Sequence, residues 1–489
     1  MTTSAQEKAC DLILFGTKGD LARRKLLPAL YQLEKAGLLA ADSRIIGVAR
    51  DESDTPGYVQ TVEENLRKFL KEPFEDDVWQ RMQKKLLYVQ IDLTKPQEYQ
   101  KLAKITDLSK RIPVSYFATP PSLFSQLCQG LASAGLAQEP SRVVLEKPIG
   151  HDLASSKAIN DEVARYFKEC QIYRIDHYLG KETVLNLLAL RFANAIFASN
   201  WDHNTIDHVQ ISVAEEVGVE GRWGYYDDAG QMRDMVQNHL LQVLAFIAME
   251  PPARLDADSL RDEKLKVLKA LRRIDISNVQ EKTVRGQYSS GFVSGKAVPG
   301  YLEEEGARQN SKTETFVAIK VDIDNWRWAG VPFYLRTGKR MPKKHTEVVI
   351  CFKPQPHNIF HETYKHLPAN KLIIRLQPDE GVEIQVMNKI PGLGENMQLQ
   401  ESKLDLSFDE TFKSQRIADA YERLLLEAML GNQYLFVRRD EVEQAWSWVD
   451  GIQDAWKSIN EPPKSYQAGS WGPVAAISLL ARDDRNWDE

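Results

Sequence analysis

The apolar residues in the first third of the chain fall into short continuous runs. Each run is too short for a helix and is typical of a strand buried on both faces of a sheet. Helical patterns, with apolar residues three and four positions apart, separate the runs. This alternation predicts a parallel, doubly wound sheet. The predicted strands are residues 11–15, 44–50, 86–91, 114–118, 142–145 and 171–175.

From about residue 205 onward, apolar and polar residues alternate one by one. Val209, Ile211 and Val213 show this pattern first, and it returns near residues 317–323, 382–386 and 404–408. Such strands, without helices between them, predict a mainly antiparallel open sheet with helices on one face. We therefore predict two domains, an α/β domain over residues 1–178 and a larger α+β domain over residues 179–489.

Composition narrows the range of partners. The chain has 489 residues, 43% of them hydrophobic and 27% charged, with a formal net charge of -6. No basic excess is available to neutralise nucleic-acid phosphates, so we expect no nucleic-acid partner. Four scattered cysteines give neither zinc-ligand spacing nor a disulfide framework. Residues 1–9 are polar and no apolar run approaches about 18 residues, so we expect a cytoplasmic protein without a membrane partner.

A glycine-rich turn follows the first predicted strand and opens a helical pattern. Its residues are Gly16, Thr17, Lys18, Gly19, Asp20, Leu21 and Ala22. Two glycines allow close backbone approach, and free N–H groups at a helix start suit a pyrophosphate. The same letters also fit an ordinary corner between a strand and a helix. Read as a nucleotide site, they predict a Rossmann-like dinucleotide-binding domain.

Two charged residues at later strand ends fit that interpretation. Arg50 closes the second predicted strand, where an arginine suits the 2′-phosphate of NADP and an acid would suit NAD. Lys147 follows the fifth strand, and Pro148 forces it into an extended conformation. Alternatively, Arg50 could be an ordinary solvated residue at a strand end, and Lys147 could be an exposed lysine in a loop. Asp92 and Leu93 lie at the carboxyl end of the third strand and are further candidates for the cofactor site.

The segment of residues 174–182 gathers ionisable groups after the sixth predicted strand. It reads Arg-Ile-Asp-His-Tyr-Leu-Gly-Lys-Glu. Binding sites in open α/β sheets lie at such strand ends, although a surface turn would also carry these letters. Further along, His239 falls in the apolar stripe of a predicted helix, where an imidazole is either a core residue or a tuned base. A basic cluster over residues 336–344 could receive a phosphate or could be a solvated loop.

Taken together, these stretches resemble the glucose-6-phosphate dehydrogenase family over essentially the whole chain. The resemblance rests on residues 16–22, 146–148, 174–182, 238–239 and 336–339. The nonapeptide at 174–182 is highly specific for that family. The family's phosphate loop usually reads Gly-Ala-Ser-Gly-Asp-Leu, whereas Thr17 and Lys18 stand here. Lys18 adds a charge beside the cofactor, which bears on the choice between NADP and NAD.

The resemblance implies oxidation of glucose 6-phosphate at C1 to 6-phosphogluconolactone, with hydride transfer to NADP and with NAD as a weaker alternative. His239 would be the general base, oriented by Asp176. Arg50 would bind the 2′-phosphate, and Lys147 would lie between cofactor and substrate. The residues implied to hold the 6-phosphate are His177, Tyr178 and Lys181, and those implied to hold the sugar are Glu215, Asp234, Lys339 and Lys344. No metal is required.

Two other interpretations fit parts of the chain. One is an NAD(P)-dependent dehydrogenase of an unphosphorylated sugar or polyol, but its substrate would leave Lys181 without a phosphate. The other is a non-enzymatic NADP-binding regulator, which would tolerate loss of His239 or Asp176, and both are present. The family also implies a homodimer or homotetramer formed through the large sheet.

Overall fold

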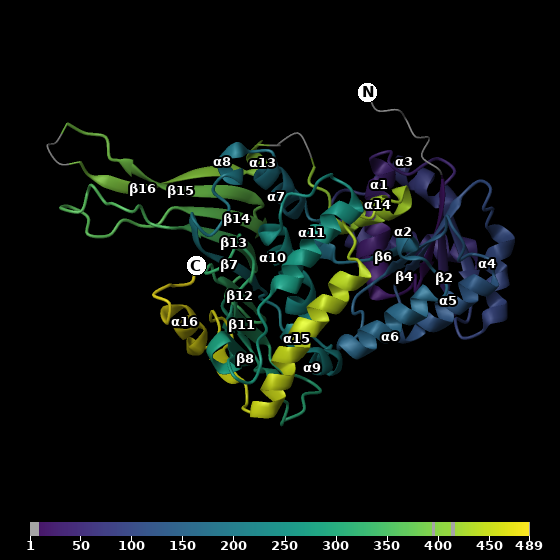
Figure 1. Cartoon of the computed structure of the whole chain (residues 1–489). Helices are drawn as coiled ribbons and strands as arrows, with labels where there is room; N and C mark the ends of the chain where they lie inside the picture. The colour runs from purple at the N-terminus through teal and green to yellow at the C-terminus, as the bar shows by residue number, and fades with distance from the viewer. Residues whose placement is uncertain (1–8, 394–396, 412–415, 489) are drawn as a thin grey trace. The chain divides into compact units, whose positions relative to one another are not determined.

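A computed structural model describes residues 9–393, 397–411 and 416–488 (Figure 1). Most of the polar amino-terminal segment therefore lies outside the described residues. The chain forms two compact units. Unit 1 comprises Met1–Lys181, Pro252–Asp262 and Ala418–Glu443, and unit 2 comprises Glu182–Pro251, Glu263–Ile417 and Gln444–Glu489. The boundary after residue 178 stays a prediction.

Unit 1 is built on a six-stranded sheet in which every strand pair is parallel, in the order β3-β2-β1-β4-β5-β6. Its strands are β1 (Cys10–Phe15), β2 (Arg44–Ala49), β3 (Leu86–Gln90), β4 (Ile112–Phe117), β5 (Arg142–Leu145) and β6 (Ile172–Arg174). Its helices include α1 (Leu27–Lys35), α2 (Thr55–Phe69), α3 (Asp76–Met82), α4 (Gln100–Ile105), α5 (Phe124–Ser133), α6 (Leu153–Ala164) and α14 (Ala420–Leu430). Short 3-10 segments are Gln83–Lys85, Pro96–Tyr99, Pro121–Leu123, Glu169–Gln171 and His177–Gly180, and Ala22–Leu26 is π-helical.

The strand order explains where a ligand can enter unit 1. β1 is buried along its whole length and pairs with β2 on one side and β4 on the other. The chain therefore reverses its direction of travel across the sheet at β1, and the carboxyl ends of β1 and β4 flank a crevice. In open parallel sheets this switch point is where ligands bind. The predicted doubly wound parallel sheet is confirmed.

Two later segments complete unit 1. The α14 helix begins with a capping box, in which Asp419 accepts from Tyr421 N–H and Glu422 accepts from Asp419 N–H. The Arg142 guanidinium donates to the carbonyls at the end of α14, Ala428 and Met429. These bonds fasten a helix from the last quarter of the sequence to the first residue of β5.

Unit 2 is built on a nine-stranded sheet in the order β16-β15-β14-β13-β7-β12-β11-β8-β17 (Figure 1). Among its described strands, the β7–β12 and β8–β17 pairs are parallel and the others antiparallel, so the predicted mainly antiparallel sheet is confirmed. The strands are β7 (Ile206–Ala214), β8 (Thr283–Ser289), β11 (Phe316–Val321), β12 (Phe333–Gly338), β13 (His345–Phe352), β14 (Lys371–Gln377), β15 (Gly381–Lys389), β16 (Leu399–Ser407) and β17 (Lys464–Gln467). A separate hairpin pairs β9 (Gly291–Val293) with β10 (Lys296–Val298).

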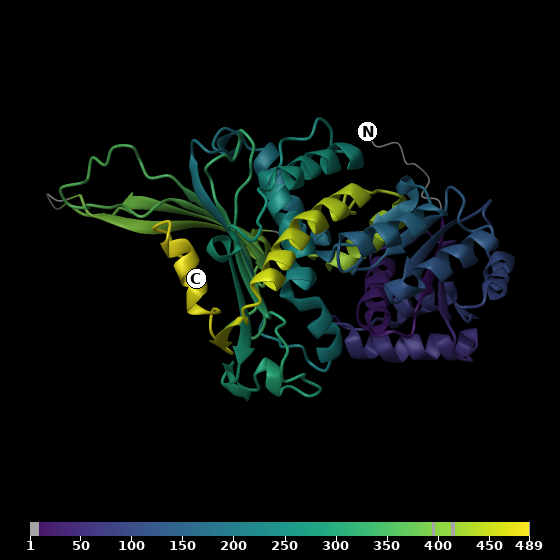
Figure 2. The same ribbon diagram turned by 60° about the horizontal axis from the view of Figure 1, so that its bottom comes forward.

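Helices were predicted on one face of this sheet, but they pack on both, and Figures 1 and 2 show α16 on the opposite side of the strands from α15. The difference arises because α16, near the end of the chain, buries Leu479 and Leu480 against Tyr288 of the sheet. The helices of unit 2 are α7 (Glu182–Phe192), α8 (Ala195–Ala198), α9 (Trp223–Gln231), α10 (Leu241–Ala248), α12 (Val279–Lys282), α13 (Phe408–Thr411) and α16 (Val474–Ala481), with a 3-10 turn at Tyr301–Glu303. Residues Met232–Leu240 form a π-helix between α9 and α10. The division between the units falls inside α11 (Ala257–Ala270) and α15 (Arg439–Ile459).

No helix among the described residues is both long and apolar enough to span a bilayer.

Candidate functional site

A pocket of about 380 Å³ lies at the carboxyl ends of the unit 1 strands. Six of the predicted cofactor residues line it: Gly16, Lys18, Gly19, Arg50, Asp92 and Leu93. Segments after β1, β2, β3 and β4 each contribute to the wall. The other four predicted residues, Thr17, Asp20, Leu21 and Lys147, are absent from that lining. Thr17 is buried and its hydroxyl shares a 2.6 Å hydrogen bond with Tyr58, while Asp20 accepts from Arg24 on the surface.

The turn after β1 has no room for a side chain at its first residue, Gly16. Gly16 has φ +82°, and a Cβ there would lie 2.4 Å from the Ala118 carbonyl oxygen. Both facts exclude an ordinary side chain, because the conformation is left-handed and the space is taken by backbone. The Gly19 N–H donates to the Gly16 carbonyl, which closes the turn ahead of the helix. The backbone can therefore approach a diphosphate closely.

Charges are distributed along the rim of this pocket. The Lys18 ammonium lies 3.6 Å from the Asp51 carboxylate and above the Tyr88 ring, 5.4 Å from its centroid. Arg50 stands beside Asp51 at the end of β2. The pocket rim thus offers two cations and one acid where the second strand ends.

The Glu146-Lys147-Pro148 segment after β5 is anchored by a buried carboxyl. Glu146 accepts hydrogen bonds from the phenols of Tyr116 and Tyr421. Burial raises the pKa of Glu146, and the two phenol hydrogen bonds oppose that rise. The bond between Lys147 and Pro148 is cis. The backbone that carries Lys147 is therefore held from inside unit 1.

Asp176 begins the short 3-10 helix that carries the predicted phosphate residues. Its carboxylate caps that helix by accepting from Tyr178 N–H at 2.9 Å. The Lys181 ammonium lies over the Tyr178 ring, 3.8 Å from the centroid. The His177 ring packs against Tyr178 and stacks with Tyr421 at 6.3 Å between centroids. Unit 1 thus brings His177, Tyr178 and Lys181 together.

In unit 2 a lysine joins two acids. The Lys339 ammonium, just after β12, lies 2.8 Å from Glu215 and 4.0 Å from Asp234. Glu215 follows β7, and its N–H donates to the Gly338 carbonyl, so pairing of β7 with β12 sets the spacing. The Tyr226 ring lies 5.1 Å from the same ammonium. Three predicted sugar residues therefore converge, while Lys344 is exposed on the loop beyond.

His239 is fully buried in the π-helix Met232–Leu240. The expected α-helix was wrong in its winding, because the wider π turn is not visible in an apolar stripe. π-Helical segments are rare in proteins, and those that occur often lie at functional sites. His239 belongs to unit 2 and Asp176 to unit 1, so their pairing stays a prediction.

Sequence reasoning missed Tyr116, Tyr421 and Tyr226, which support the predicted residues. One sequence feature could have pointed to Tyr421. The Asp419 to Glu422 capping box marks the start of α14, the helix that carries this residue. That signal gives a helix start but does not say which strand end the helix covers.

Comparisons with known proteins agree along the whole chain. Residues 13–186 match the model for the glucose-6-phosphate dehydrogenase NAD binding domain, and residues 188–488 match that for the C-terminal domain. The chain belongs to the glucose-6-phosphate dehydrogenase family. The predicted family and the predicted class of enzyme, an oxidoreductase with a nicotinamide cofactor, are confirmed.

Family members of known name cover the chain from end to end. Glucose-6-phosphate 1-dehydrogenase of Dickeya dadantii is 64% identical over 489 residues, covering 100% of both chains. The enzyme of the same name from Zymomonas mobilis is 52% identical, covering 97% of this chain and 98% of its own. A solved structure of glucose-6-phosphate dehydrogenase in complex with its substrate glucose-6-phosphate has a TM-score of 0.90 at 35% identity and covers 100% of both chains.

Proposed function

We propose that this chain oxidises glucose 6-phosphate at C1 and delivers the hydride to NADP, giving 6-phosphogluconolactone, the first step of the oxidative pentose phosphate pathway. Glucose-6-phosphate dehydrogenase activity follows from the family, and the choice of NADP and the roles of residues are our proposal. The observation that supports it most is family identity over the full length, at 64% to a named enzyme.

The cofactor pocket of unit 1 fits a dinucleotide. The left-handed Gly16 leaves a backbone cradle that a Cβ would fill. The helix that follows would present its N–H groups to a diphosphate. Arg50 would hold the 2′-phosphate and thereby favour NADP over NAD. Lys18 would add a second cation, shared with Asp51. When bound, the nicotinamide supplies the acceptor for the hydride.

The proton is taken by a side chain. His239 would accept it from the C1 hydroxyl, because a neutral imidazole is a base near physiological pH. Asp176 would orient the imidazole and stabilise its charged form. As the O–H electrons form the C1 carbonyl, the hydride leaves C1. No metal enters this proposal, because the base and the orientation of the sugar supply what the step needs.

The substrate phosphate and the sugar hydroxyls would bind to different groups. His177, Tyr178 and Lys181 would hold the 6-phosphate through charge-assisted hydrogen bonds. Glu215 and Asp234 would accept from sugar hydroxyls. The residues that would complete the sugar site are Lys339, Lys344 and Lys147. Assembly into a homodimer or homotetramer and a cytoplasmic location stay predictions.

One rate experiment tests the proposal. The purified chain is mixed with glucose 6-phosphate and NADP, and the absorbance of reduced nicotinamide is followed, with parallel wells of free glucose and of NAD. We expect fast reduction with the phosphorylated sugar and slower reduction with NAD. Reduction with free glucose alone would favour the sugar or polyol dehydrogenase. Silence in every well, with NADP still bound, would favour the regulator.

A further inference from the structure

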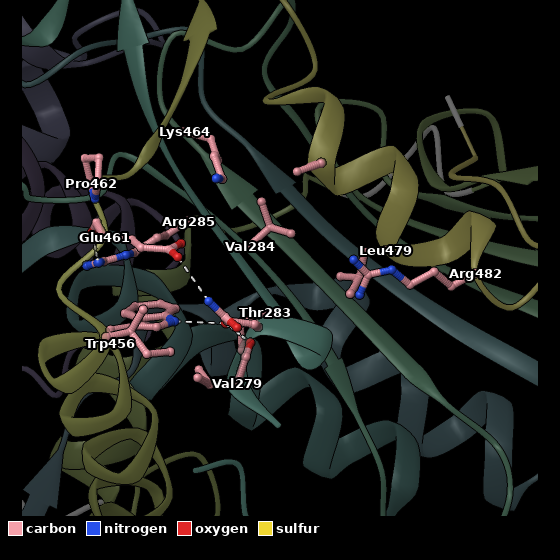
Figure 3. Close-up of a pocket in the computed structure, with 13 residues that line it drawn as sticks. Val279, Thr283, Val284, Arg285, Trp456, Glu461, Pro462, Lys464, Leu479 and Arg482 are labelled. Carbon is pink, nitrogen blue, oxygen red and sulfur yellow. Dashed lines mark hydrogen bonds between the residues drawn. The ribbon is translucent and has the colours of Figure 1, made fainter. Parts of the chain in front are cut away.

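Unit 2 contains a second pocket, of about 340 Å³, that none of the proposed roles uses. It lies beside the open edge of β8. β17 pairs with β8 only from Gly286 to Ser289. Residues 283–285 of β8 pair with β11 on one side, and on the other side they have no strand partner among the described residues. The end of α15, the start of β17 and one side of α16 surround this gap (Figure 3). Its volume is at the lower end of the range of about 300–1,000 Å³ typical of small-molecule sites.

Part of the wall is apolar and well fixed. Val279, Trp456 and Leu479 are each less than 7% exposed although they line the pocket. The Trp456 indole N–H donates to the Thr283 hydroxyl at 2.9 Å, which sets the plane of the ring (Figure 3). A rigid wall with a flat aromatic side chain suits a flat apolar body.

The remaining wall is cationic. Arg285 comes from β8, Lys464 from the start of β17 and Arg482 from the residue after α16 (Figure 3). Arg285 and Arg482 lie at opposite ends of the pocket, and Arg482 donates to the Glu281 carbonyl at 3.2 Å. None of the three is ion-paired with a described carboxylate. The one acid in the lining, Glu461, accepts instead from the Gln280 amide at 3.1 Å. The lining therefore carries three formal positive charges and one negative charge, on a chain whose net charge is -6.

Arg285 is the most constrained of these cations. It is half-buried, its guanidinium lies 5.3 Å from the Trp456 ring centroid, and one of its N–H groups donates to the Glu461 carbonyl. Burial lowers the pKa of Arg285, and the charges of Glu314 and Glu461 only partly offset that effect. A guanidinium has five N–H donors in a rigid fork. Within the described chain one donor is used, which leaves the others to an anion in the pocket.

We propose that this pocket binds a small organic anion, a phosphate or carboxylate group joined to a flat apolar body. The anionic group would contact Arg285 and Lys464, and the flat body would lie against Trp456. Either group suits the arginine fork, which matches planar and tetrahedral oxyanions alike. This site is separate from the cofactor pocket, because every residue that lines it belongs to unit 2.

The test is calorimetry on the intact chain, saturated with glucose 6-phosphate and NADPH so that its phosphate-binding sites are filled. The probes are 1-naphthyl phosphate and 1-naphthoate, with inorganic phosphate as the isolated head group and 1-naphthol as the isolated body. We expect one saturable site per chain for a naphthyl anion, with each half alone about tenfold or more weaker. Whichever of the two naphthyl anions binds more tightly shows whether the site prefers a phosphate or a carboxylate group.

Variants assign that binding to the pocket. Arg285→Gln should weaken the preferred probe about tenfold, as loss of a charge-assisted contact predicts. Lys464→Gln, at an exposed position that cannot disturb the core, should weaken it several-fold. Lys457→Gln is the matched control, because this exposed lysine lies next to Trp456, pairs with Asp454 and does not line the pocket. Absence of saturable binding, unchanged affinity in both pocket variants, or an equal loss in the control would each overturn the proposal.

Discussion

Replacing Lys339 by methionine should destabilise unit 2 and weaken substrate binding together. The side chain of Lys339 is 6% exposed, and its two acid partners, Glu215 and Asp234, are 28% and 19% exposed. Methionine keeps much of the length and the apolar stem but removes the charge. The two acids would then face each other without their shared cation.

The expected loss in the free energy of unfolding follows from this degree of burial. A unit charge pair at 4 Å gains about 4 kcal/mol at an effective dielectric constant of about 20, before desolvation is subtracted. Breaking a fully buried pair costs about 3–5 kcal/mol, whereas an exposed pair is worth about 0–1 kcal/mol. Because the acids retain partial access to water, we expect Lys339→Met to lower the free energy of unfolding by about 2 kcal/mol. For a unit of about 270 residues, that loss corresponds to a fall of about 3–4 °C in the thermal midpoint.

The assay pairs thermal denaturation with steady-state kinetics, and Lys344→Met is the control. Lys344 lies five residues away on the same loop and is exposed, so its loss should leave the thermal midpoint unchanged. Both variants should raise KM for glucose 6-phosphate if both lysines contact the sugar. Equal midpoints for the two variants would refute the energetic argument. An unchanged KM in Lys339→Met would refute its role in the sugar site.

Three further predictions concern single groups. His239→Asn should lower kcat by several orders of magnitude with KM nearly constant, since a base acts in the transition state; stopped-flow and steady-state rates would show whether turnover survives instead. Arg50→Ala should reduce kcat/KM for NADP more than for NAD. An equal reduction of kcat/KM for both cofactors would mean that Arg50 has only a structural role. Arg485 holds the pKa of Asp207 well below its ordinary range, so the stability it adds is present above about pH 4 and is lost as pH falls further. Thermal midpoints from pH 7 to pH 3 should therefore fall more steeply for the parent chain than for Asp207→Asn, and parallel curves would contradict this.

The sequence specified the sheet of unit 1 well because its strands are buried on both faces. Runs such as Leu12 to Phe15 cannot form a surface helix, and a glycine turn after the first of them predicts a helix start. The segments that unit 1 takes from later in the chain were not predictable in the same way. The α14 pattern marks an amphipathic helix, but nothing in it names Arg142 as the partner of its last carbonyls.

The candidate site was predictable where chemistry and spacing coincide in one segment. Residues 176–181 follow one strand end, so their proximity comes from local geometry. The convergence of Lys339 with Glu215 depends instead on the pairing of β7 with β12, which period-two alternation cannot specify. Tyr421 meets Glu146 through docking of a helix, and no local pattern encodes that contact.

Unit 1 is built from segments that lie far apart in the sequence, and this has a consequence for its synthesis on the ribosome. Residues up to Lys181 emerge early, but α14 and its bonds to Arg142 and Cys10 need the chain up to Glu443. At about 5–20 residues per second, the nascent sheet waits roughly 13–50 s for its last helix. During that interval the surface of unit 1 that α14 covers stays exposed, so a chaperone that shields apolar surface has a defined period in which to act. A fragment that stops at Lys181 would carry this exposed surface permanently.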